Sequence, residues 1–418
     1  MTGQALPFTS SPVVGEVTVP GSKSETNRAL VLAALADGPS ALRGVLDSRD
    51  SQLMIDALRA LGVSLERDGD ALVVTPPVRF RGALDIDCGL AGTVMRFVPP
   101  IALLADGPST FIGDPHASER PMGPILDGLR QLGALVSEDA LPFRLVPPAA
   151  FGSEASVDAS GSSQFVSGLL LIGSLLPDGL MLRHTGATLP SRPHIAMTCE
   201  MLRARGVRID QPDESTWVVA PGPIAALDLL IEPDLTNAAV FLAAAAATGG
   251  RVTVPGWPET SLQPDALFLE LAARMGATVE RDDGSVTLVG PERLHGIDVD
   301  LTTASELTPV IAALGALAAG TTTIRGVGHI RGHETDRLAA LVAELTKLGV
   351  RAEETADGLT VEGGAALQRA EVETYADHRM VHFAAILALA QPGITVTDLE
   401  CVSKTMPAFP QDWAGLVS

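Results

Sequence analysis

The chain has 418 residues, of which 46% are hydrophobic and 4% aromatic, and its formal net charge is −21. That length suffices for two or three domains, and so acidic a surface argues against nucleic acid or an anionic membrane as a partner. The chain has three scattered cysteines, and no signal-peptide pattern is seen at its N-terminus. Its longest apolar runs have about ten residues, whereas a membrane-spanning helix needs roughly 20. These features favour a cytoplasmic protein.

One pattern recurs along the whole chain. Six times, an alanine- and leucine-rich helical run ends in a glycine turn that precedes a strand, and these glycines are 69 to 73 residues apart. An amphipathic helix, a glycine and a strand hairpin fall between successive turns with the same period. A fixed period of this kind indicates a repeated supersecondary unit. The turn glycines are Gly38, Gly107, Gly179, Gly249, Gly320 and Gly393.

Six units are too many for one layer around a core, so two domains of three units each are expected. The apolar helix of each unit should lie at the centre of its domain, because a helix that is hydrophobic all round has to be buried. The predicted boundary is the proline-containing segment 231–237, and the strand before residue 20 completes the second domain. The expected domains are therefore 21–233, and 1–20 together with 234–418, with hinges near residue 20 and at 231–237.

Segment 19–30, with the sequence VPGSKSETNRAL, is the first unusual charged segment. Lys23, Ser24 and Arg28 stand at the start of a buried apolar helix, and Ser24 or Thr26 is expected to cap it. Because the free N–H groups of a helix start attract negative charge, this helix start beside two cations predicts an anion site. An ordinary cap with two solvated cations is the alternative interpretation.

Three later helix starts carry comparable groups. Segment 88–97 combines glycines with Arg96, segment 159–166 contains Ser162 and Ser163, and segment 376–383 contains Asp377, His378 and Arg379. Four of six equivalent helix starts therefore carry anion-binding chemistry, and we expect their N-termini to converge on a substrate with several anionic groups. Further charged residues that fit this site are Arg120, Arg331, His333, Glu334, Arg337 and Lys404.

Other kinds of site receive little support. The pairs His329/His333 and His378/His382 have the i, i+4 spacing of helical metal ligands, but neighbouring arginines would repel a cation, so no metal is expected. Cys88 is interpreted as a small buried residue. Neither a Walker A nor a G-x-G-x-x-G phosphate loop is present.

Six segments together resemble the 5-enolpyruvylshikimate-3-phosphate synthase family. They are PGSKSETNRAL, GLAGTVMR, ERPMG, SSQF, ETDRL and DHRM. They occur in the family's order, and the match extends over essentially the whole chain. The resemblance implies an α/β fold, an enolpyruvyl-transferase-like inside-out barrel of two domains with three βαβαββ repeats each, which close on substrates in the cleft between them. It also implies transfer of the enolpyruvyl group of phosphoenolpyruvate to the 5-hydroxyl of shikimate 3-phosphate in the shikimate pathway, without a cofactor or metal. A monomer is expected.

The resemblance assigns a role to each matching residue. Glu306 near His333 is the candidate base, Glu334 the acid, and Lys23 an alternative proton carrier. The expected phosphoenolpyruvate ligands are Lys23, Gly92, Arg120, Gln164, Arg337, Arg379 and Lys404. The expected shikimate 3-phosphate ligands are Ser24, Arg28, Ser162, Ser163, Gln164, Ser191, Glu306 and His333.

Several positions depart from the family's pattern. Glu306 replaces the usual Asp, His333 the usual Lys, and His194 the usual Tyr; the glycine loop has Leu90 for Asn, His329 stands where an Asn is frequent, and Phe97 where a Pro is frequent. His333 is expected to be only partly charged near neutral pH. Gly92 in place of Ala predicts sensitivity to glyphosate, which competes with phosphoenolpyruvate in this family.

Two other functions stay open at this point. UDP-N-acetylglucosamine enolpyruvyl transferase shares the fold, but it typically carries a cysteine in the loop that here reads GDPHASERP. A non-catalytic anion-binding paralogue is the second alternative, because three expected site residues are substituted.

Overall fold

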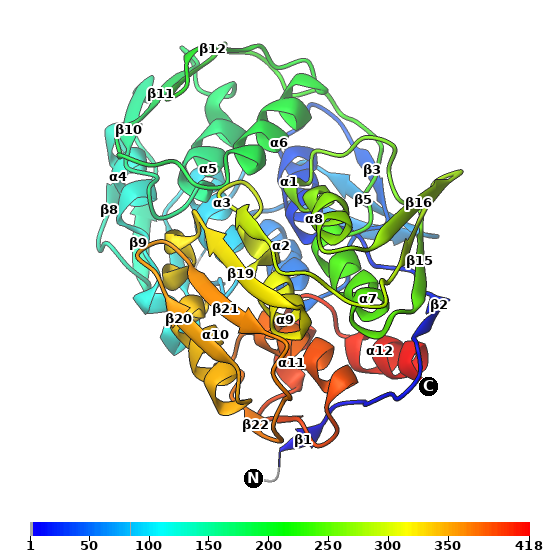
Figure 1. Ribbon diagram of the computed structural model, residues 1–418. Helices are drawn as coiled ribbons and strands as arrows, with labels where there is room; N and C mark the ends of the chain where they lie inside the picture. Colours follow the sequence, from blue (N-terminus) through cyan, green and yellow to red (C-terminus); the bar gives the residue numbers. More distant parts are fainter. Residues whose placement is uncertain (1–2, 84) are drawn as a thin grey trace. The chain divides into compact units, whose positions relative to one another are not determined.

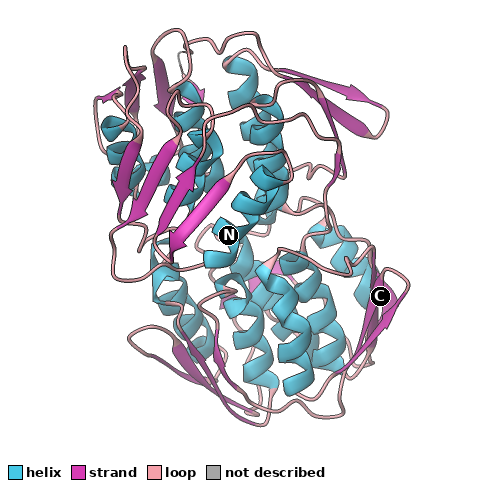
Figure 2. Cartoon of the chain, turned by 90° about the horizontal axis from the view of Figure 1, so that it is seen from above, coloured by secondary structure: helices cyan, strands magenta, loops and turns pink. Residues whose placement is uncertain are grey.

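A computed structural model gives the structure of residues 3–83 and 85–418. The chain divides into two units, each of which is described by itself: unit 1 comprises residues 1–20 and 232–418, and unit 2 comprises residues 21–231. Figure 1 traces the chain from the N-terminus in blue to the C-terminus in red. In each unit the helices gather together and the strands lie outside them (Figure 2).

Unit 2 contains three four-stranded sheets, with the orders β14–β3–β5–β4, β6–β7–β9–β8 and β10–β11–β13–β12. Its strands are β3 (Ser40–Arg43), β4 (Ser64–Asp68), β5 (Ala71–Thr75), β6 (Ile86–Asp87), β7 (Ser109–Ile112), β8 (Leu135–Val136), β9 (Phe143–Val146), β10 (Glu154–Val157), β11 (Leu180–His184), β12 (Ile209–Asp213), β13 (Thr216–Val219) and β14 (Leu229–Leu230). Its helices are α1 (Lys23–Ala34), α2 (Arg49–Ala60), α3 (Gly92–Ala102), η1 (Pro115–Glu119), α4 (Gly123–Gln131), α5 (Gln164–Gly173) and α6 (Arg192–Arg203).

Unit 1 contains the sheets β16–β17–β15–β2, β18–β19–β21–β20 and the three-stranded β1–β23–β22. Its strands are β1 (Gln4–Ala5), β2 (Val14–Glu16), β15 (Arg251–Pro255), β16 (Thr278–Asp282), β17 (Ser285–Val289), β18 (Asp298–Asp300), β19 (Gly320–Arg325), β20 (Arg351–Glu354), β21 (Leu359–Gly363), β22 (Glu371–Val372) and β23 (Thr395–Val396). Its helices are α7 (Leu235–Thr248), η2 (Pro264–Leu267), α8 (Phe268–Arg274), η3 (Ser305–Leu307), α9 (Thr308–Leu317), η4 (Gly328–Gly332), α10 (Arg337–Lys347), α11 (His378–Ala390), η5 (Glu400–Lys404) and α12 (Phe409–Val417).

The expected βαβαββ repeat is confirmed, and the pairing of the strands shows how it is built. In the third repeat of unit 2, β10 and β11 are parallel and joined through α5, whereas β12 and β13 form an antiparallel hairpin reached through α6. Parallel neighbours need a crossover connection, and a helix supplies it. In two repeats the first strand comes from a distant part of the chain. β14 pairs in parallel with β3, and β2 pairs in parallel with β15.

The apolar helices form the middle of each unit, as the sequence predicted. Every residue of α7 from Leu235 to Ala246 is buried, and α9 and α11 are buried over nearly their whole lengths. Residues 242 to 246 of α7 are one Leu followed by four Ala, and the small alanine side chains allow close helix packing. None of the described helices is long and apolar enough to cross a membrane.

Candidate active site

Arg337 is the centre of a charged cluster in unit 1. It is the first residue of α10, and only 1% of its side chain is exposed. Its Nη1 lies 2.9 Å from Oε2 of Glu306, its Nη2 lies 2.8 Å from Oε2 of Glu334, and its Nε lies 2.9 Å from Oδ2 of Asp377. Burial acts to lower the pKa of Arg337, but these three carboxylates outweigh it and raise the pKa above its ordinary value. The guanidinium is therefore permanently charged.

Two further cations join the same carboxylates. Arg379, the second residue of α11, lies 2.6 Å from Glu306 through its Nε, and Lys404 at the end of η5 lies 2.5 Å from Oε1 of Glu334. The structure thus brings together five of the predicted site residues, Arg337, Arg379, Lys404, Glu306 and Glu334. Asp377 caps α11 by accepting a hydrogen bond from the Arg379 N–H at 2.9 Å, and this fixes the direction in which the helix starts.

Glu306 carries a negative charge in this cluster. It lies on η3, directly before α9, and 27% of its side chain remains exposed. Burial acts to raise its pKa, but Arg379 and Arg337 hold the pKa of this carboxyl well below its ordinary value. A carboxylate that is ionised at neutral pH can accept a proton, although two neighbouring guanidinium groups weaken it as a base.

His333 is neutral, which corrects the expectation that it is partly charged near neutral pH. Burial lowers its pKa to about 3, with nearby Arg337 acting in the same direction and Glu306 opposing. Nη1 of Arg337 donates a hydrogen bond to Nδ1 of His333 at 3.2 Å, which places the imidazole proton on Nε2. His333 therefore offers a neutral N–H donor and adds no positive charge to the cluster.

A buried carboxyl near the same helix starts was missed by the sequence analysis. Asp265, on η2, is 4% exposed, and its Oδ1 has no hydrogen-bond partner among the described residues. Burial raises its pKa to about 7; Arg379 opposes the shift, and Asp234 and Glu306 add to it. Asp234 is the N-cap of α7, so charged groups from the starts of α7, α9 and α11 act on one another within unit 1.

The start of α1 provides the corresponding cations of unit 2. Ser22 caps this helix by accepting a hydrogen bond from the Glu25 N–H, so the expectation that Ser24 or Thr26 is the cap was wrong. Thr26 instead accepts a hydrogen bond from the N–H of Leu46. Nζ of Lys23 lies 3.6 Å from Asp50, which is buried at the start of α2 and which the sequence analysis did not consider.

Arg28 connects several helices of unit 2. Its Nε donates to Oγ1 of Thr198 at 2.8 Å, and its Nη groups donate to the carbonyls of Ser24 and His194. The guanidinium also lies 5.2 Å from the centre of the Phe97 ring. Burial lowers the pKa of Arg28 to about 10, which still leaves it charged at neutral pH. The hydrogen bond from Nδ2 of Asn27 to Oγ1 of Thr93 at 2.8 Å then joins the start of α1 to that of α3.

Gly92 at the start of α3 lies against two predicted cations. A Cβ atom at this position would be 3.1 Å from Nη2 of Arg120 and 3.1 Å from Nη1 of Arg96. Arg120 donates to the Leu90 carbonyl at 2.9 Å, and its buried Nε has no partner among the described residues. Arg96 donates to the carbonyls of Gly92 and Pro121. The absence of a side chain at Gly92 therefore leaves room for both guanidinium groups.

The remaining predicted residues lie at two other helix starts of unit 2. Ser163 precedes α5, and Oγ of Ser162 accepts a hydrogen bond from the N–H of Gln164 at 3.2 Å. Ser191 precedes α6 in a left-handed conformation with φ of 50°. Such a conformation costs free energy in a residue with a Cβ atom and is frequent at functional sites. Thr198 on α6 donates to Oγ of Ser167 on α5 at 3.1 Å, which brings α5 and α6 together beside Arg28.

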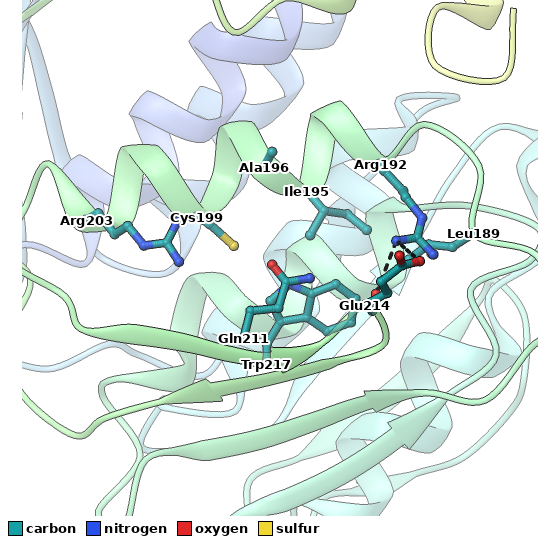
Figure 3. Close-up of a pocket in the computed structure, with 9 residues that line it drawn as sticks. All are labelled: Leu189, Arg192, Ile195, Ala196, Cys199, Arg203, Gln211, Glu214 and Trp217. Carbon is teal, nitrogen blue, oxygen red and sulfur yellow. Dashed lines mark hydrogen bonds and ion pairs between the residues drawn. The ribbon is translucent and has the colours of Figure 1, made fainter.

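A pocket of about 190 Å³ lies elsewhere in unit 2, between α6 and the β12–β13 hairpin (Figure 3). Trp217 and Cys199 line its apolar part. Its arginines are already paired: Arg192 lies 3.2 Å from Glu214, and Arg203 lies 2.6 Å from Glu200. Since none of the predicted substrate residues lines it, we place no substrate there. Among residues 3–83 and 85–418, no group of three or more His, Cys, Asp or Glu side chains is arranged to hold a metal ion.

Comparisons with known proteins agree with this architecture. The structure matches an EPSP synthase from Acinetobacter baumannii with a TM-score of 0.80 and 24% identity over 99% of this chain and 98% of that one. It also matches the enolpyruvyl transferase NikO from Streptomyces tendae with a TM-score of 0.75 and 19% identity over 99% and 98% of the two chains. The fold is therefore that of the enolpyruvyl transferases.

Sequence comparison narrows this class to one family. The model of the EPSP synthase (3-phosphoshikimate 1-carboxyvinyltransferase) family matches residues 8–413. A 3-phosphoshikimate 1-carboxyvinyltransferase from Mycobacterium ulcerans is 48% identical over 98% of this chain and 97% of its own length, and one from Kocuria rhizophila is 50% identical over 97% and 94%. The chain belongs to the EPSP synthase family.

Proposed function

We propose that this protein transfers the carboxyvinyl group of phosphoenolpyruvate to the 5-hydroxyl of shikimate 3-phosphate and releases phosphate. The observation that carries the proposal is the cluster in unit 1 in which Arg337, Arg379 and Lys404 contact Glu306 and Glu334. The reaction needs cations for an anionic substrate and carboxyl groups for two proton transfers, and this cluster provides both in one place.

Phosphoenolpyruvate is the expected ligand of the three cations. Its carboxylate and phosphate would take over the hydrogen bonds that Glu306 and Glu334 now accept from Arg337 and Lys404, and would replace Glu306 as the ion-pair partner of Arg379. Planar guanidinium groups suit both anions, because they can donate two parallel hydrogen bonds. In unit 2 we assign Lys23, Gly92, Arg120 and Gln164 to the same substrate.

Substrate binding would also activate the base. Glu306 has a low pKa because Arg379 and Arg337 stabilise its charge. An anion that neutralises those guanidinium groups removes this stabilisation, so the pKa of Glu306 rises and it becomes a stronger base. The neutral His333 beside it would donate its Nε2 proton to a substrate oxygen. Glu306 is thus activated only when phosphoenolpyruvate is present.

The proposed steps balance in atoms and charge. The 5-hydroxyl oxygen bonds to C2 of phosphoenolpyruvate and gives its proton to Glu306. The methylene carbon takes a proton from Glu334, which enters this step in its protonated form, or alternatively from the ammonium group of Lys23. The adduct then loses a methyl proton to the same group, and the bond between C2 and the phosphate oxygen breaks. The proton on Glu306 leaves with the phosphate, whose developing charge Arg379 and Lys404 stabilise.

We assign shikimate 3-phosphate to the helix starts of unit 2. Arg28 is held by hydrogen bonds to Thr198 and to two carbonyls, so its charge is fixed beside the starts of α1 and α6. Fixed cations at helix starts suit a phosphate group. The proposed ligands are Ser24, Arg28, Ser162, Ser163, Gln164 and Ser191, together with Glu306 and His333 of unit 1.

The ligands proposed for each substrate come from both units, so we infer that the substrates draw the units together about hinges near residues 20 and 231–237. Solution scattering should show a smaller radius of gyration when shikimate 3-phosphate and an unreactive phosphoenolpyruvate mimic are both present at saturation. An unchanged radius would reject closure. We further propose a cytoplasmic monomer, which scattering at zero angle can test through the molecular mass.

Phosphate release tests the function directly. Turnover should require both phosphoenolpyruvate and shikimate 3-phosphate, and the organic product should be the enol ether of the 5-hydroxyl. Binding of both compounds without phosphate release would instead identify an anion-binding paralogue. Turnover with UDP-N-acetylglucosamine in place of shikimate 3-phosphate would identify the other enolpyruvyl transfer.

A further inference from the structure

The turn that leads into α11 has an unusual backbone. Tyr375 and Ala376 both have a φ of 54°, so two successive residues with Cβ atoms adopt the left-handed conformation. That conformation is sterically unfavourable for both residues and persists only where the surroundings hold it. The next residues are Asp377, which caps α11, and Arg379. The strained turn therefore determines the positions of Asp377 and Arg379, which are two members of the charged cluster.

A buried carboxylate holds this turn. Glu344 on α10 has no exposed surface, yet the sequence analysis did not single it out. Its Oε1 accepts hydrogen bonds from the hydroxyl of Tyr375 at 2.8 Å and from Nζ of Lys347 at 2.8 Å, and its Oε2 accepts one from the Glu373 N–H at 3.1 Å. Burial raises the pKa of Tyr375 to about 12, and Glu344 and Glu373 add to the shift. The phenol therefore remains a hydrogen-bond donor at neutral pH.

The same helix contacts the turn at its other end. Arg337 lies seven residues before Glu344, which is two helical turns and therefore the same face of α10. Through Nε, Arg337 contacts Asp377 at 2.9 Å, and Glu344 contacts residues 373 and 375. One face of α10 thus fixes both sides of the strained pair 375–376. Figure 1 shows α10 and α11 in unit 1.

A third element supports the turn. The side chain of Thr397, just beyond β23, accepts a hydrogen bond from the Thr374 N–H at 3.1 Å and donates one to Oε1 of Glu373 at 2.9 Å. The Tyr375 N–H in turn donates to Glu373 at 3.3 Å. A buried and well-connected polar network of this kind fixes one backbone conformation.

We propose that Glu344 and Tyr375 are positioning residues, which hold the strained turn 375–376 and thereby place Asp377 and Arg379 for phosphoenolpyruvate binding. The inference rests on the proposed function of Arg379. Neither residue is assigned a contact with substrate, so both act through the backbone of the turn and the start of α11.

The experiment compares Glu344→Gln with Glu353→Gln, which removes an exposed carboxylate paired with Arg351 on the surface of the same unit. The amide introduced by Glu344→Gln would present two donors where one carboxylate oxygen accepted, so at least one of the present contacts is lost. We expect the KM for phosphoenolpyruvate to rise roughly tenfold in Glu344→Gln with a smaller fall in kcat and no change in the KM for shikimate 3-phosphate. Tyr375→Phe should also raise the KM for phosphoenolpyruvate, but by less, because Lys347 still pairs with Glu344. The Glu353→Gln variant should match the wild type.

A spectroscopic measurement separates positioning from a merely structural role. Tyr375 is the only tyrosine in the chain, so 3-fluorotyrosine incorporation gives a single ¹⁹F resonance from the turn. We expect this resonance to shift in Glu344→Gln and to stay in place in Glu353→Gln. In Glu344→Gln, a shifted ¹⁹F resonance with an unchanged KM for phosphoenolpyruvate would overturn the inference. A resonance that does not shift in this variant would overturn it as well. If the wild-type protein releases no phosphate from the two substrates, the proposed function itself is rejected. The phosphate-release assay on the wild type alone distinguishes that outcome from a failure of the present inference.

Discussion

The arginines of the candidate site lie in opposite electrostatic surroundings in the two units, although Lys23 of unit 2 lies 3.6 Å from Asp50. In unit 1, Arg337, Arg379 and Lys404 are matched by carboxylates at 2.5 to 2.9 Å. In unit 2, Arg28 and Arg120 donate to carbonyl and hydroxyl oxygens, and neither has a carboxylate partner among the described residues. Their surroundings also move the pKa of Arg337 up and that of Arg28 down.

The contrast separates two ways of binding an anion. An anion that reaches unit 1 must compete with carboxylates that already belong to the protein, and this competition frees those carboxylates for proton transfer. An anion that reaches Arg28 meets a fixed positive charge without a competitor, which suits a group that is held but not transformed. We therefore expect the carboxylates of unit 1 to take part in proton transfer and Arg28 of unit 2 to hold a group that does not react.

The largest effect that would test this contrast is on catalysis. Glu306→Gln and Glu334→Gln keep the shape of each side chain and remove its proton transfer, so kcat should fall by about 10²–10⁴-fold with modest change in substrate binding. Glu280→Gln, which removes an exposed carboxylate paired with Arg251 at 2.5 Å, is the control. A nearly normal kcat in Glu306→Gln would transfer the role of base to Lys23 or His333.

The second prediction concerns stability. Arg337→Met leaves three carboxylates without their shared counter-charge and should lower the free energy of unfolding by about 3–5 kcal/mol. Arg28→Met removes a buried cation that has only neutral partners. It should lower the free energy of unfolding by about 1–3 kcal/mol, because the oxygen acceptors of Arg28 are left unpaired. Denaturant unfolding measures both values. Mild acid should narrow the deficit of Arg337→Met, because protonation neutralises the carboxylates; equal costs for the two variants would contradict the contrast.

The third prediction concerns selectivity at unit 2. In Gly92→Ala the new methyl group would lie 3.1 Å from the mobile ends of Arg96 and Arg120, so the fold is retained while both cations shift by a few tenths of an ångström. We expect a glyphosate-sensitive wild type, with an inhibition constant that rises about tenfold or more in the variant while the KM for phosphoenolpyruvate changes less than about threefold. Gly123→Ala is a matched control, since Gly123 also starts a helix and has no atom within 4 Å of the new methyl. Equal shifts in both constants would mean that Gly92 does not discriminate between the ligands.

The smallest expected effect is on stability in acid. The free energy of unfolding should fall less steeply with falling pH in His382→Leu, a variant of unit 1, than in the wild type. His382 is 1% exposed, and burial lowers its pKa from 6.5 to about 3. Between these values the unfolded chain binds a proton that the folded chain does not, so the free energy of unfolding falls as the pH falls. His382→Leu should reduce that slope by up to about 1.4 kcal/mol per pH unit. His116→Leu, at an exposed position of unit 2, is the control. The same slope in all three proteins would show that His382 titrates normally.

The repeat was predictable because its turns demand a particular residue. Gly62, Gly133, Gly206, Gly276 and Gly349 all have positive φ, between 82° and 108°, at the end of the amphipathic helix. Glycine adopts this conformation without steric cost, so the requirement leaves a periodic mark in the sequence. Buried apolar helices likewise follow directly from composition.

The electrostatic partners were not predictable from local sequence. Ser22, Ser24 and Thr26 are all residues that cap helices well, and only the path of the backbone selects Ser22. Lys404 and Glu334 are 70 residues apart, and nothing near either one specifies the pairing. The neutral state of His333 depends on burial by the folded unit, and Glu344 has the appearance of an ordinary charged residue on an amphipathic helix. Which cation pairs with which carboxylate is decided by packing.

The strand that the chain's first residues add to unit 1 has a consequence for synthesis on the ribosome. Residues 21–231 are contiguous, so unit 2 has its complete set of strands as soon as β14 emerges. Gln4 and Ala5, in contrast, pair with Val396 and Thr395 at the far end of the chain. At about 5–20 residues per second, Gln4 and Ala5 wait on the order of 20 to 80 seconds until these partners have been made. Gln4 and Ala5 are therefore among the last residues of unit 1 to form their strand pairing.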